Sequence, residues 1–272
     1  MPECADVRGT PASALTRGGD EEESAHVSDE ARPSGPTAEP ANEVEREPIV
    51  IGHFATYRLS PRFWSLEGGE RKKKARAWYD AVAGSCDVLQ LYLVQGIQPG
   101  ADVLMWSSVR VDGPTAPADF FRRRAAADNA HRHAVEPIDV IWGMTRPSEY
   151  SRAAKSAQEI DPFAARRAPY LVAYPFTKTA EWYLLGRETR QGMMNEHIRI
   201  GKQFREITQL LLYSFGLQDQ EFVVVYETDD LTLFSRLVYD LRDTEARRYT
   251  RSDTPLHTGV WISADDWART LG

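Results

Sequence analysis

The stretch that decides the fold runs from residue 169 to residue 204 and reads PYLVAYPFTKTAEWYLLGRETRQGMMNEHIRIGKQF. Residues 169–177 are rich in β-branched and aromatic side chains, a composition typical of a strand. Residues 186–204 carry apolar side chains three and four positions apart, which predicts a helix with one apolar face. The chain therefore passes from a strand into an amphipathic helix.

The same kind of pattern continues after this stretch and also precedes it. The sequence next predicts strands over 206–215 and 221–228, joined by the turn Gly216-Leu217-Gln218-Asp219, then a helix over 230–243 and a strand over 255–263. The first half repeats this succession, with elements predicted over 48–57, 67–84, 87–95, 102–109, 117–131 and 135–144. Two β-α-β-β-α-β units predict an α+β fold of two ferredoxin-like domains, whose sheets pack face to face or close into a dimeric α/β-barrel-type fold.

Composition divides the chain into four parts. Residues 1–47 contain no aromatic residue and include the acidic run from Asp20 to Glu23. Such a segment cannot bury enough apolar surface to offset the entropy that ordering costs, so we expect a disordered acidic tail. An N-terminal ferredoxin-like domain then spans 48–147, a polar connector 148–167, and a C-terminal ferredoxin-like domain 168–272.

Charge and hydropathy exclude several classes of protein. Of the net charge of −7, residues 1–48 contribute 12 acidic and 4 basic residues, which leaves 28 acidic and 29 basic residues in the remainder. The folded part therefore lacks the basic field of a nucleic-acid-binding protein. No apolar run approaches the roughly 20 residues that span a bilayer, which excludes a transmembrane protein. The start of the chain lacks the pattern of a secretory signal, and the two cysteines form no disulfide framework, so a cytoplasmic location is expected.

One histidine stands out once the common catalytic motifs are found to be absent. Glycine-rich phosphate loops, Gly-x-Ser-x-Gly, His-Glu-x-x-His and Cys-x-x-Cys do not occur. His197 falls on the apolar stripe that also contains Met193, Ile200 and Phe204. A histidine in such a place is more often a hydrogen-bonded core residue than a ligand. No other ligand stands near it for a zinc site, whereas an axial haem ligand needs only one histidine.

The strand before this helix carries a second candidate group. In an extended segment Tyr174, Phe176 and Lys178 point to the same face, so a phenol and an ammonium would share one wall of a cavity. The alternative is a core tyrosine with a lysine that reaches the solvent at the rim. The residues alone leave both interpretations open.

Several separated motifs in this half agree in order and spacing with one family. They are Tyr174-Pro-Phe-x-Lys178, Glu181-Trp182-Tyr183, Met193-Met194-x-Glu196-His197, Gly216-Leu217-x-Asp219-x-Glu221-Phe222 and Tyr226-Glu227-Thr228-x-Asp230-Leu231. Together they resemble the chlorite dismutase-like superfamily, which contains chlorite dismutases and coproheme decarboxylases. The resemblance is strong over 169–262 and weaker over 48–147. It implies two ferredoxin-like halves, a haem-type cofactor bound by the C-terminal domain, and a homo-oligomer, commonly a pentamer.

The resemblance assigns the residues next to the iron. His197 matches the axial ligand of the haem iron. Glu245 matches the acidic residue that, in chlorite dismutases, accepts a hydrogen bond from this histidine; the alternative is a charge at a helix end that faces solvent. On the distal side, chlorite dismutases place an arginine seven residues before the glycine of the Gly-Leu-x-Asp turn, and this chain has Gln209 there. In having glutamine at this position, the chain resembles coproheme decarboxylases. Arg205 is the nearest cation that a shift in register could bring to this position.

The resemblance therefore implies a peroxide-dependent coproheme decarboxylase. Iron coproporphyrin III would be both cofactor and substrate, and conversion of two propionates to vinyl groups would give haem b. The oxidised phenol of Tyr174 would abstract a hydrogen from the propionate, while Lys178 would hold the carboxylate. Trp182 would pack on the porphyrin edge or belong to the core, and Arg166 and Arg167 are candidate clamps for propionates.

Two other functions stay open at this stage. The first is a chlorite dismutase or weak haem peroxidase, and the second is a non-catalytic protein that binds or delivers haem. The expected partners are coproheme, hydrogen peroxide, further copies of the chain and, transiently, coproporphyrin ferrochelatase. Neither a nucleic acid nor a membrane is expected as a partner.

Overall fold

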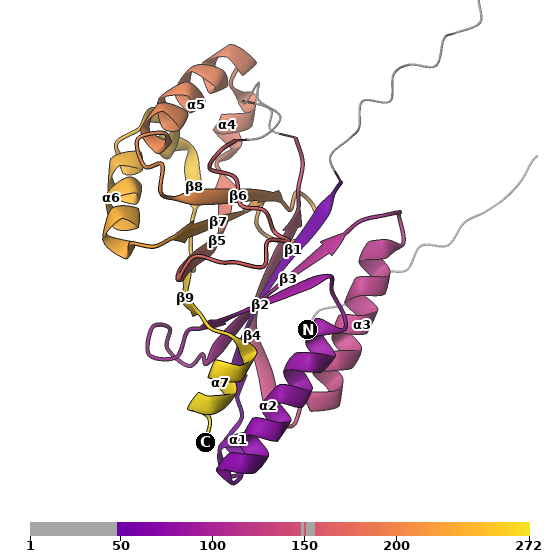
Figure 1. The fold of residues 1–272 in the computed structure, drawn as a ribbon. Helices are drawn as coiled ribbons and strands as arrows, with labels where there is room; N and C mark the ends of the chain where they lie inside the picture. The colour runs from indigo at the N-terminus through magenta and orange to yellow at the C-terminus, as the bar shows by residue number, and fades with distance from the viewer. Residues whose placement is uncertain (1–47, 148–149, 151–155) are drawn as a thin grey trace, which may run out of the picture. The chain divides into compact units, whose positions relative to one another are not determined.

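The computed structural model describes residues 48–147, 150 and 156–272, and these form two halves of the same design (Figure 1). The elements of the N-terminal half are β1 (Val50–Leu59), α1 (Pro61–Trp64), α2 (Gly68–Ala83), β2 (Val88–Leu93), β3 (Val103–Arg110), α3 (Ala116–His131) and β4 (Val135–Met144). Those of the C-terminal half are β5 (Tyr170–Lys178), α4 (Ala180–Leu184), α5 (Arg187–Gly201), β6 (Thr208–Tyr213), β7 (Phe222–Thr228), α6 (Leu231–Arg242), η1 (Glu245–Tyr249), β8 (Thr250–Ser252), β9 (His257–Trp261) and α7 (Ala264–Thr270). The predicted order β-α-β-β-α-β occurs in each half, and the α+β class is confirmed.

The strands pair in a closed ring. Their order is β7-β6-β4-β1-β3-β2-β9-β5-β8, and β7 also pairs with β5, so that each strand except β8 has a neighbour on both sides. Within each half the pairing is extensive and antiparallel. The halves meet at two short seams, where Met144 of β4 pairs with Tyr213 of β6 and the end of β2 pairs with β9.

Side chains on the strands alternate between the interior of the ring and the helices. The interior is apolar and draws on both halves, with Phe54, Trp106, Leu171, Leu212 and Val225 among its members. The outer face of the N-terminal strands packs against α2 and α3, whereas α5 and α6 lie over the C-terminal strands (Figure 1). Because the two halves share one interior, residues 47–272 form a single compact unit.

The C-terminal helix differs from the predicted domain boundary. Residues 168–272 were expected to form one domain, yet Trp267 of α7 packs on Trp78 of α2 with ring centroids 6.1 Å apart. Trp267 and Leu271 belong to the apolar cluster of the N-terminal half. The predicted tail, 1–47, lies outside the described residues, as do 148, 149 and 151–155 of the predicted connector.

Local signals explain where the elements of the C-terminal half begin and turn. Gly216 has a φ of 70°, which favours glycine, and it forms the predicted turn between β6 and β7. Asp230 caps α6, because its side chain accepts hydrogen bonds from the backbone N–H groups of Thr232 and Leu233. Gly186 stands at the N-terminus of α5 and provides no side-chain cap.

Candidate functional site

The predicted site residues converge on the face of β5, β7 and β6 that α5 and α6 cover. Tyr174 pairs with Val224, which in turn pairs with Leu211. In the adjacent row, Tyr226 pairs with Gln209. Directly paired residues point to the same side of a sheet, so Tyr174 and Gln209 share one face although they are distant in sequence.

Helix α5 covers this face without burying any residue completely. Its counterpart in the N-terminal half, α2, buries Ala75, Trp78 and Val82. His197 lies partly buried on α5, next to Ile200, which packs on the cluster formed by Val172, Tyr226 and residues of α6. Helix α5 therefore packs less closely on its sheet than α2 does.

His197 has the properties of a metal ligand. Burial, together with a smaller effect of the nearby positive charge of Lys178, lowers the pKa of His197 to about 4. The imidazole is therefore neutral near pH 7. Within the described part of the chain, its ring nitrogens take part in no hydrogen bond. A neutral imidazole with a free lone pair is the form that binds iron or another metal.

Lys178 is held in one place by several contacts. Its Nζ donates a hydrogen bond to the carbonyl of Ala246 at 3.2 Å and lies 4.2 Å from the centre of the Trp182 ring. Its backbone N–H donates to Glu221 at 2.7 Å. Burial lowers the pKa of the Lys178 ammonium to about 8, with a further contribution from Arg247. The group thus keeps its proton at pH 7 and is easier to deprotonate than a surface lysine.

Tyr174 is a partly buried, neutral phenol. Burial raises its pKa well above the ordinary value, and the neighbouring phenol of Tyr226 adds to this effect. The two rings lie 6.4 Å apart and within 26° of parallel. Tyr174 therefore retains its proton over the whole physiological range of pH.

Gln209 presents its side chain to solvent on the same face. The backbone is fixed, because its N–H donates to the carbonyl of Gln158 at 2.7 Å and its carbonyl accepts from Ile160 at 3.0 Å. The side-chain amide has no hydrogen-bond partner among the described residues. It is thus available to a ligand bound between α5 and the sheet.

Trp182 and Glu245 lie at the edge of the site. Trp182 is buried, contacts Tyr249 with ring centroids 5.7 Å apart and supports Lys178. The backbone N–H of Glu245 donates to Glu196 of α5 at 3.2 Å, whereas its carboxylate lies 3.6 Å from Arg248. In the described part of the chain the Glu245 carboxylate makes no hydrogen bond to His197, so that contact stays a prediction.

Arg167 has a different role from the one that the sequence suggested. Its guanidinium is buried inside the ring of strands, 3.5 Å from Glu227, and donates to the carbonyl of Asp161 at 2.6 Å. It also lies 5.1 Å from the centre of the Trp106 ring. A side chain committed to the interior cannot clamp a propionate on the outer face, so this prediction is wrong. Arg166 is exposed beside it.

Sequence reasoning missed several charged residues around Lys178. Glu221 accepts hydrogen bonds from the backbone of Lys178 and from the hydroxyl of Tyr183, the latter at 2.5 Å. Arg247 lies near Lys178 and pairs with Asp253 at 2.6 Å. Glu221 was part of a quoted motif, but its partners only become visible when β5 and β7 are placed side by side.

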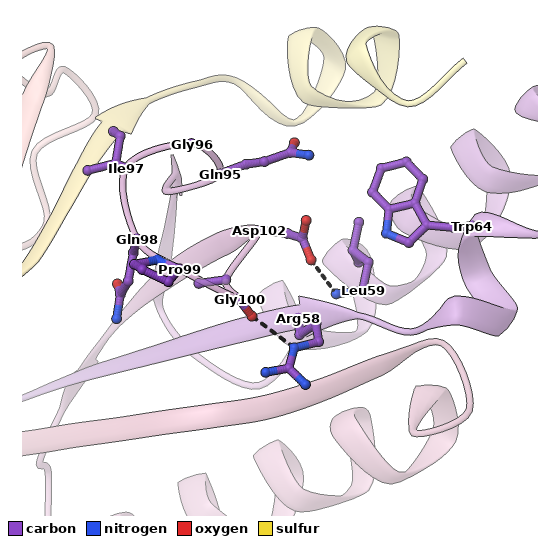
Figure 2. A pocket seen from close by; sticks show the side chains of 11 residues that line it. Arg58, Leu59, Trp64, Gln95, Gly96, Ile97, Gln98, Pro99, Gly100 and Asp102 are labelled. Carbon is purple, nitrogen blue, oxygen red and sulfur yellow. Dashed lines mark hydrogen bonds between the residues drawn. The ribbon is translucent and has the colours of Figure 1, made fainter.

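A cavity of about 510 Å³ lies elsewhere, in the N-terminal half (Figure 2). Its two charged side chains already have partners: Arg58 donates to the carbonyl of Gly100 at 2.9 Å, and Asp102 accepts from the backbone of Leu59 at 2.6 Å. The cavity holds none of the predicted site residues. We therefore place the candidate site on the C-terminal half.

The residues of the C-terminal face fit a haem-type group. The neutral imidazole of His197 would hold the iron. A contiguous aromatic surface would receive the flat macrocycle, since Phe215 contacts both Phe222, at 4.9 Å between ring centroids, and Tyr183, at 6.0 Å. Leu211, on the same face as Tyr174, is 42% exposed. Among the described residues, no group of three or more His, Cys, Asp or Glu side chains could hold a bare metal ion.

Comparison with known proteins identifies the family of this chain. A model of the family named chlorite dismutase matches residues 70–262. The chain belongs to the chlorite dismutase family. In this family, the coproheme decarboxylase of Mycolicibacterium smegmatis is 31% identical over 179 residues, which is 65% of this chain and 74% of the relative. The chlorite dismutase of Ideonella dechloratans is 24% identical over 237 residues, which is 82% of this chain and 80% of that relative.

Solved structures of the chlorite dismutase family show the same fold. The chlorite dismutase of Candidatus Nitrospira defluvii in complex with imidazole superimposes with a TM-score of 0.71 and 23% identity, covering 82% of this chain and 94% of that one. At this identity the similarity establishes the fold alone. Within the described ranges, no helix of the chain is both long and apolar enough to cross a membrane.

Proposed function

We propose that this member of the chlorite dismutase family is a coproheme decarboxylase that uses hydrogen peroxide. The observation that carries the proposal is the combination of a phenol and an ammonium on one strand, Tyr174 and Lys178, beside the neutral imidazole of His197. Similarity to the coproheme decarboxylase of M. smegmatis supports this branch of the family.

The reaction requires an oxidant as well as a bound carboxylate. Each propionate, one hydrogen peroxide and one proton give a vinyl group, carbon dioxide and two waters, and two propionates of iron coproporphyrin III react to give haem b. When bound, the iron supplies the centre at which peroxide is reduced. The chain itself must bind the porphyrin, orient the carboxylate and remove a hydrogen from the propionate β-carbon.

Tyr174 is suited to the hydrogen transfer. A phenol loses one electron together with the proton on its Oη and can then accept a hydrogen atom from a C–H bond. Its raised pKa keeps this proton on the oxygen between turnovers.

Lys178 is suited to holding the reacting carboxylate. Its ammonium, fixed between Ala246 and Trp182, would pair with the propionate by charge and hydrogen bond. A bound carboxylate favours the charged form of the lysine, so its pKa would rise above about 8 in the complex.

Gln209 favours decarboxylation over the second candidate function, chlorite decomposition. An amide offers a hydrogen bond but no fixed positive charge, so it holds an oxyanion such as chlorite less strongly than an arginine does. The relative from I. dechloratans keeps chlorite dismutase as the alternative. A non-catalytic haem-binding protein is a third alternative, against which the pairing of Tyr174 with Lys178 argues.

The proposal extends to the setting of the enzyme. We infer a cytoplasmic homo-oligomer, pentameric as is common in the family, in which Glu245 reorients to accept a hydrogen bond from His197. Coproheme would arrive through transient contact with coproporphyrin ferrochelatase, the enzyme that makes it. Trp182 would close the porphyrin edge below Lys178, and the exposed Arg166 would approach a propionate.

A titration tests the proposal directly. The purified protein is loaded with iron coproporphyrin III and then receives hydrogen peroxide in steps, while the Soret absorbance and the mass of the porphyrin are followed. We expect a three-propionate intermediate and then haem b. Bleaching without these masses, or sustained oxygen release from chlorite in a parallel assay, would overturn the proposed function.

A further inference from the structure

Arg190 is a cation on α5 that has no hydrogen-bond or ion-pair partner among the residues that the structure describes. It precedes His197 by seven residues, two helical turns, and therefore lies on the same face of the helix. Its Nε is buried and has no hydrogen-bond partner. Within the described part of the chain, no carboxylate lies within ion-pair distance of its guanidinium. Buried donors without an acceptor are rare in folded proteins and call for an explanation.

The phenol of Tyr183, on which the charge of Arg190 acts, is already hydrogen-bonded to the carboxylate of Glu221. The charge of Arg190 acts on the phenol of Tyr183, whose pKa is nevertheless raised because it is partly buried and donates to Glu221. Glu221 also accepts the backbone N–H of Lys178. Both donors bond the same oxygen, Oε2 of Glu221, and among the described residues Glu221 forms no ion pair with Arg190.

The position of Arg190 in the helix makes the unpaired charge less favourable still. It lies at the beginning of α5, where the helix dipole is positive and disfavours cations. Gly186 provides no side-chain cap for the first N–H groups of the helix. An anion bound here would satisfy Arg190 and benefit from the dipole at the same time.

We propose that Arg190 binds a carboxylate of the porphyrin, a propionate other than the one that Lys178 holds. This inference rests on the proposed function for its ligand. Seven residues at 1.5 Å of rise place Arg190 about 10 Å from His197 along the helix axis, so the cation lies toward the rim of a macrocycle centred over the imidazole. Lys178 and Arg190 would then hold the substrate at two points, from the sheet and from the helix, and fix its rotation.

The test measures binding rather than turnover. Equilibrium titrations of the full-length protein with iron coproporphyrin III, followed by Soret absorbance and tryptophan fluorescence, are repeated with the iron complex of its tetramethyl ester, which has no carboxylates. We expect Arg190→Gln to weaken binding of the acid by about tenfold and to leave binding of the ester unchanged. Arg190→Lys keeps the charge but not the planar guanidinium, so its affinity for the acid should lie between those of wild type and Arg190→Gln.

Two variants separate this role from others. Arg187→Gln removes an exposed arginine from the same turn of α5 and should leave both affinities unchanged. Glu221→Gln tests an internal ion pair: if Arg190 serves Glu221, this variant weakens the acid and the ester equally. Thermal unfolding of each unliganded variant checks that the fold is retained.

The outcomes distinguish the inference from the proposed function. Equal affinities of wild type and Arg190→Gln for the acid would overturn the role of Arg190 even if peroxide yields haem b. Conversely, loss of affinity for the acid alone would support it even if wild type binds coproheme without decarboxylating it. Equal losses of affinity for the acid and the ester would show that Arg190 maintains the fold of α5 and does not bind a carboxylate.

Discussion

The two halves of the molecule share one backbone design but use it differently. Helices α2 and α5 begin at Gly68 and Arg187, 119 residues apart, and each lies over four antiparallel strands. Counting from the positive-φ glycines Gly96 and Gly216 along the strand pairings, Ala55 takes in β1 the place of Tyr174 in β5. The remaining correspondences are Leu59 with Lys178, Leu89 with Gln209 and Trp78 with His197.

In the N-terminal half these positions form a packed core. Trp78 is 1% exposed and contacts Tyr57 and Trp267 with ring centroids 4.8 and 6.1 Å apart. In the C-terminal half the same places hold an imidazole, a phenol, an ammonium and an amide, and α5 buries no residue completely. The repeat thus places α2 over an apolar, closely packed face of the sheet and α5 over a face that carries polar groups.

The difference also has a thermodynamic side. The N-terminal half is stabilised by its own apolar contacts, whereas the C-terminal half holds Arg190, whose buried Nε has no hydrogen-bond partner among the described residues. A ligand that binds only the folded chain adds stability in proportion to the logarithm of its concentration. Porphyrin binding should therefore stabilise the C-terminal half.

The largest effect is expected from the substitution of His197, the residue at the centre of the C-terminal site. His197→Ala removes the only side chain that we assign to the iron, so the Soret band of the bound, ligated porphyrin should disappear or binding should weaken severely. His131→Ala and His133→Ala, which change the end of α3, serve as controls and should leave the spectrum unchanged. An unaltered spectrum in the His197 variant would show that another group is the ligand.

The second prediction compares the two halves by the stability that equivalent side chains contribute. Trp78→Ala removes the aromatic side chain at the equivalent position of the packed half and should lower the free energy of unfolding by about 3–5 kcal/mol. His197→Ala in the unliganded protein should cost less than about 1 kcal/mol, since its ring forms no hydrogen bond to be lost. Urea unfolding of both variants measures the difference. Similar decreases in the free energy of unfolding would mean that α5 packs on its sheet as closely as α2.

The third prediction sharpens the role of the phenol. Tyr174→Phe keeps the shape of the ring and removes the O–H group that can be oxidised, so turnover should fall by about a hundredfold or more while the affinity for coproheme changes little. Mass analysis of the porphyrin after peroxide addition gives the rate. Conversion to haem b at the wild-type rate would show that the Tyr174 hydroxyl has no part in the reaction and that the ring only lines the site.

Periodicity predicted most of the fold, because strands and long helices repeat every two or every 3.6 residues. The short elements were missed: α1, α4, η1 and α7 span only four to seven residues and contain too few turns to show a period. The position of α7 on the N-terminal half depends on Trp267 meeting Trp78, a contact between residues far apart in sequence.

The site was predicted in part for a similar reason. Tyr174 and Lys178 share a strand and His197 lies on the next long helix, so local spacing was sufficient for them. Arg167 was assigned wrongly because its partner, Glu227, faces it across the interior of the ring. Arg190 was missed because a charged residue on a helix usually faces water, and only the coordinates show that its Nε is buried without an acceptor.

The smallest expected effect concerns the charge at the position where the N-terminal half has Leu59. The pKa of Lys178 is lowered to about 8, so the ammonium is charged below this pH and loses its proton as the pH rises through it. If this charge holds a propionate, the affinity for coproheme should weaken by up to about tenfold between pH 7 and pH 9. Lys178→Met, which resembles the apolar residue of the other half, should bind weakly at both pH values. Lys178→Arg should bind well at both, because a guanidinium keeps its proton. An equal pH dependence in wild type and Lys178→Met would assign the titration to another group.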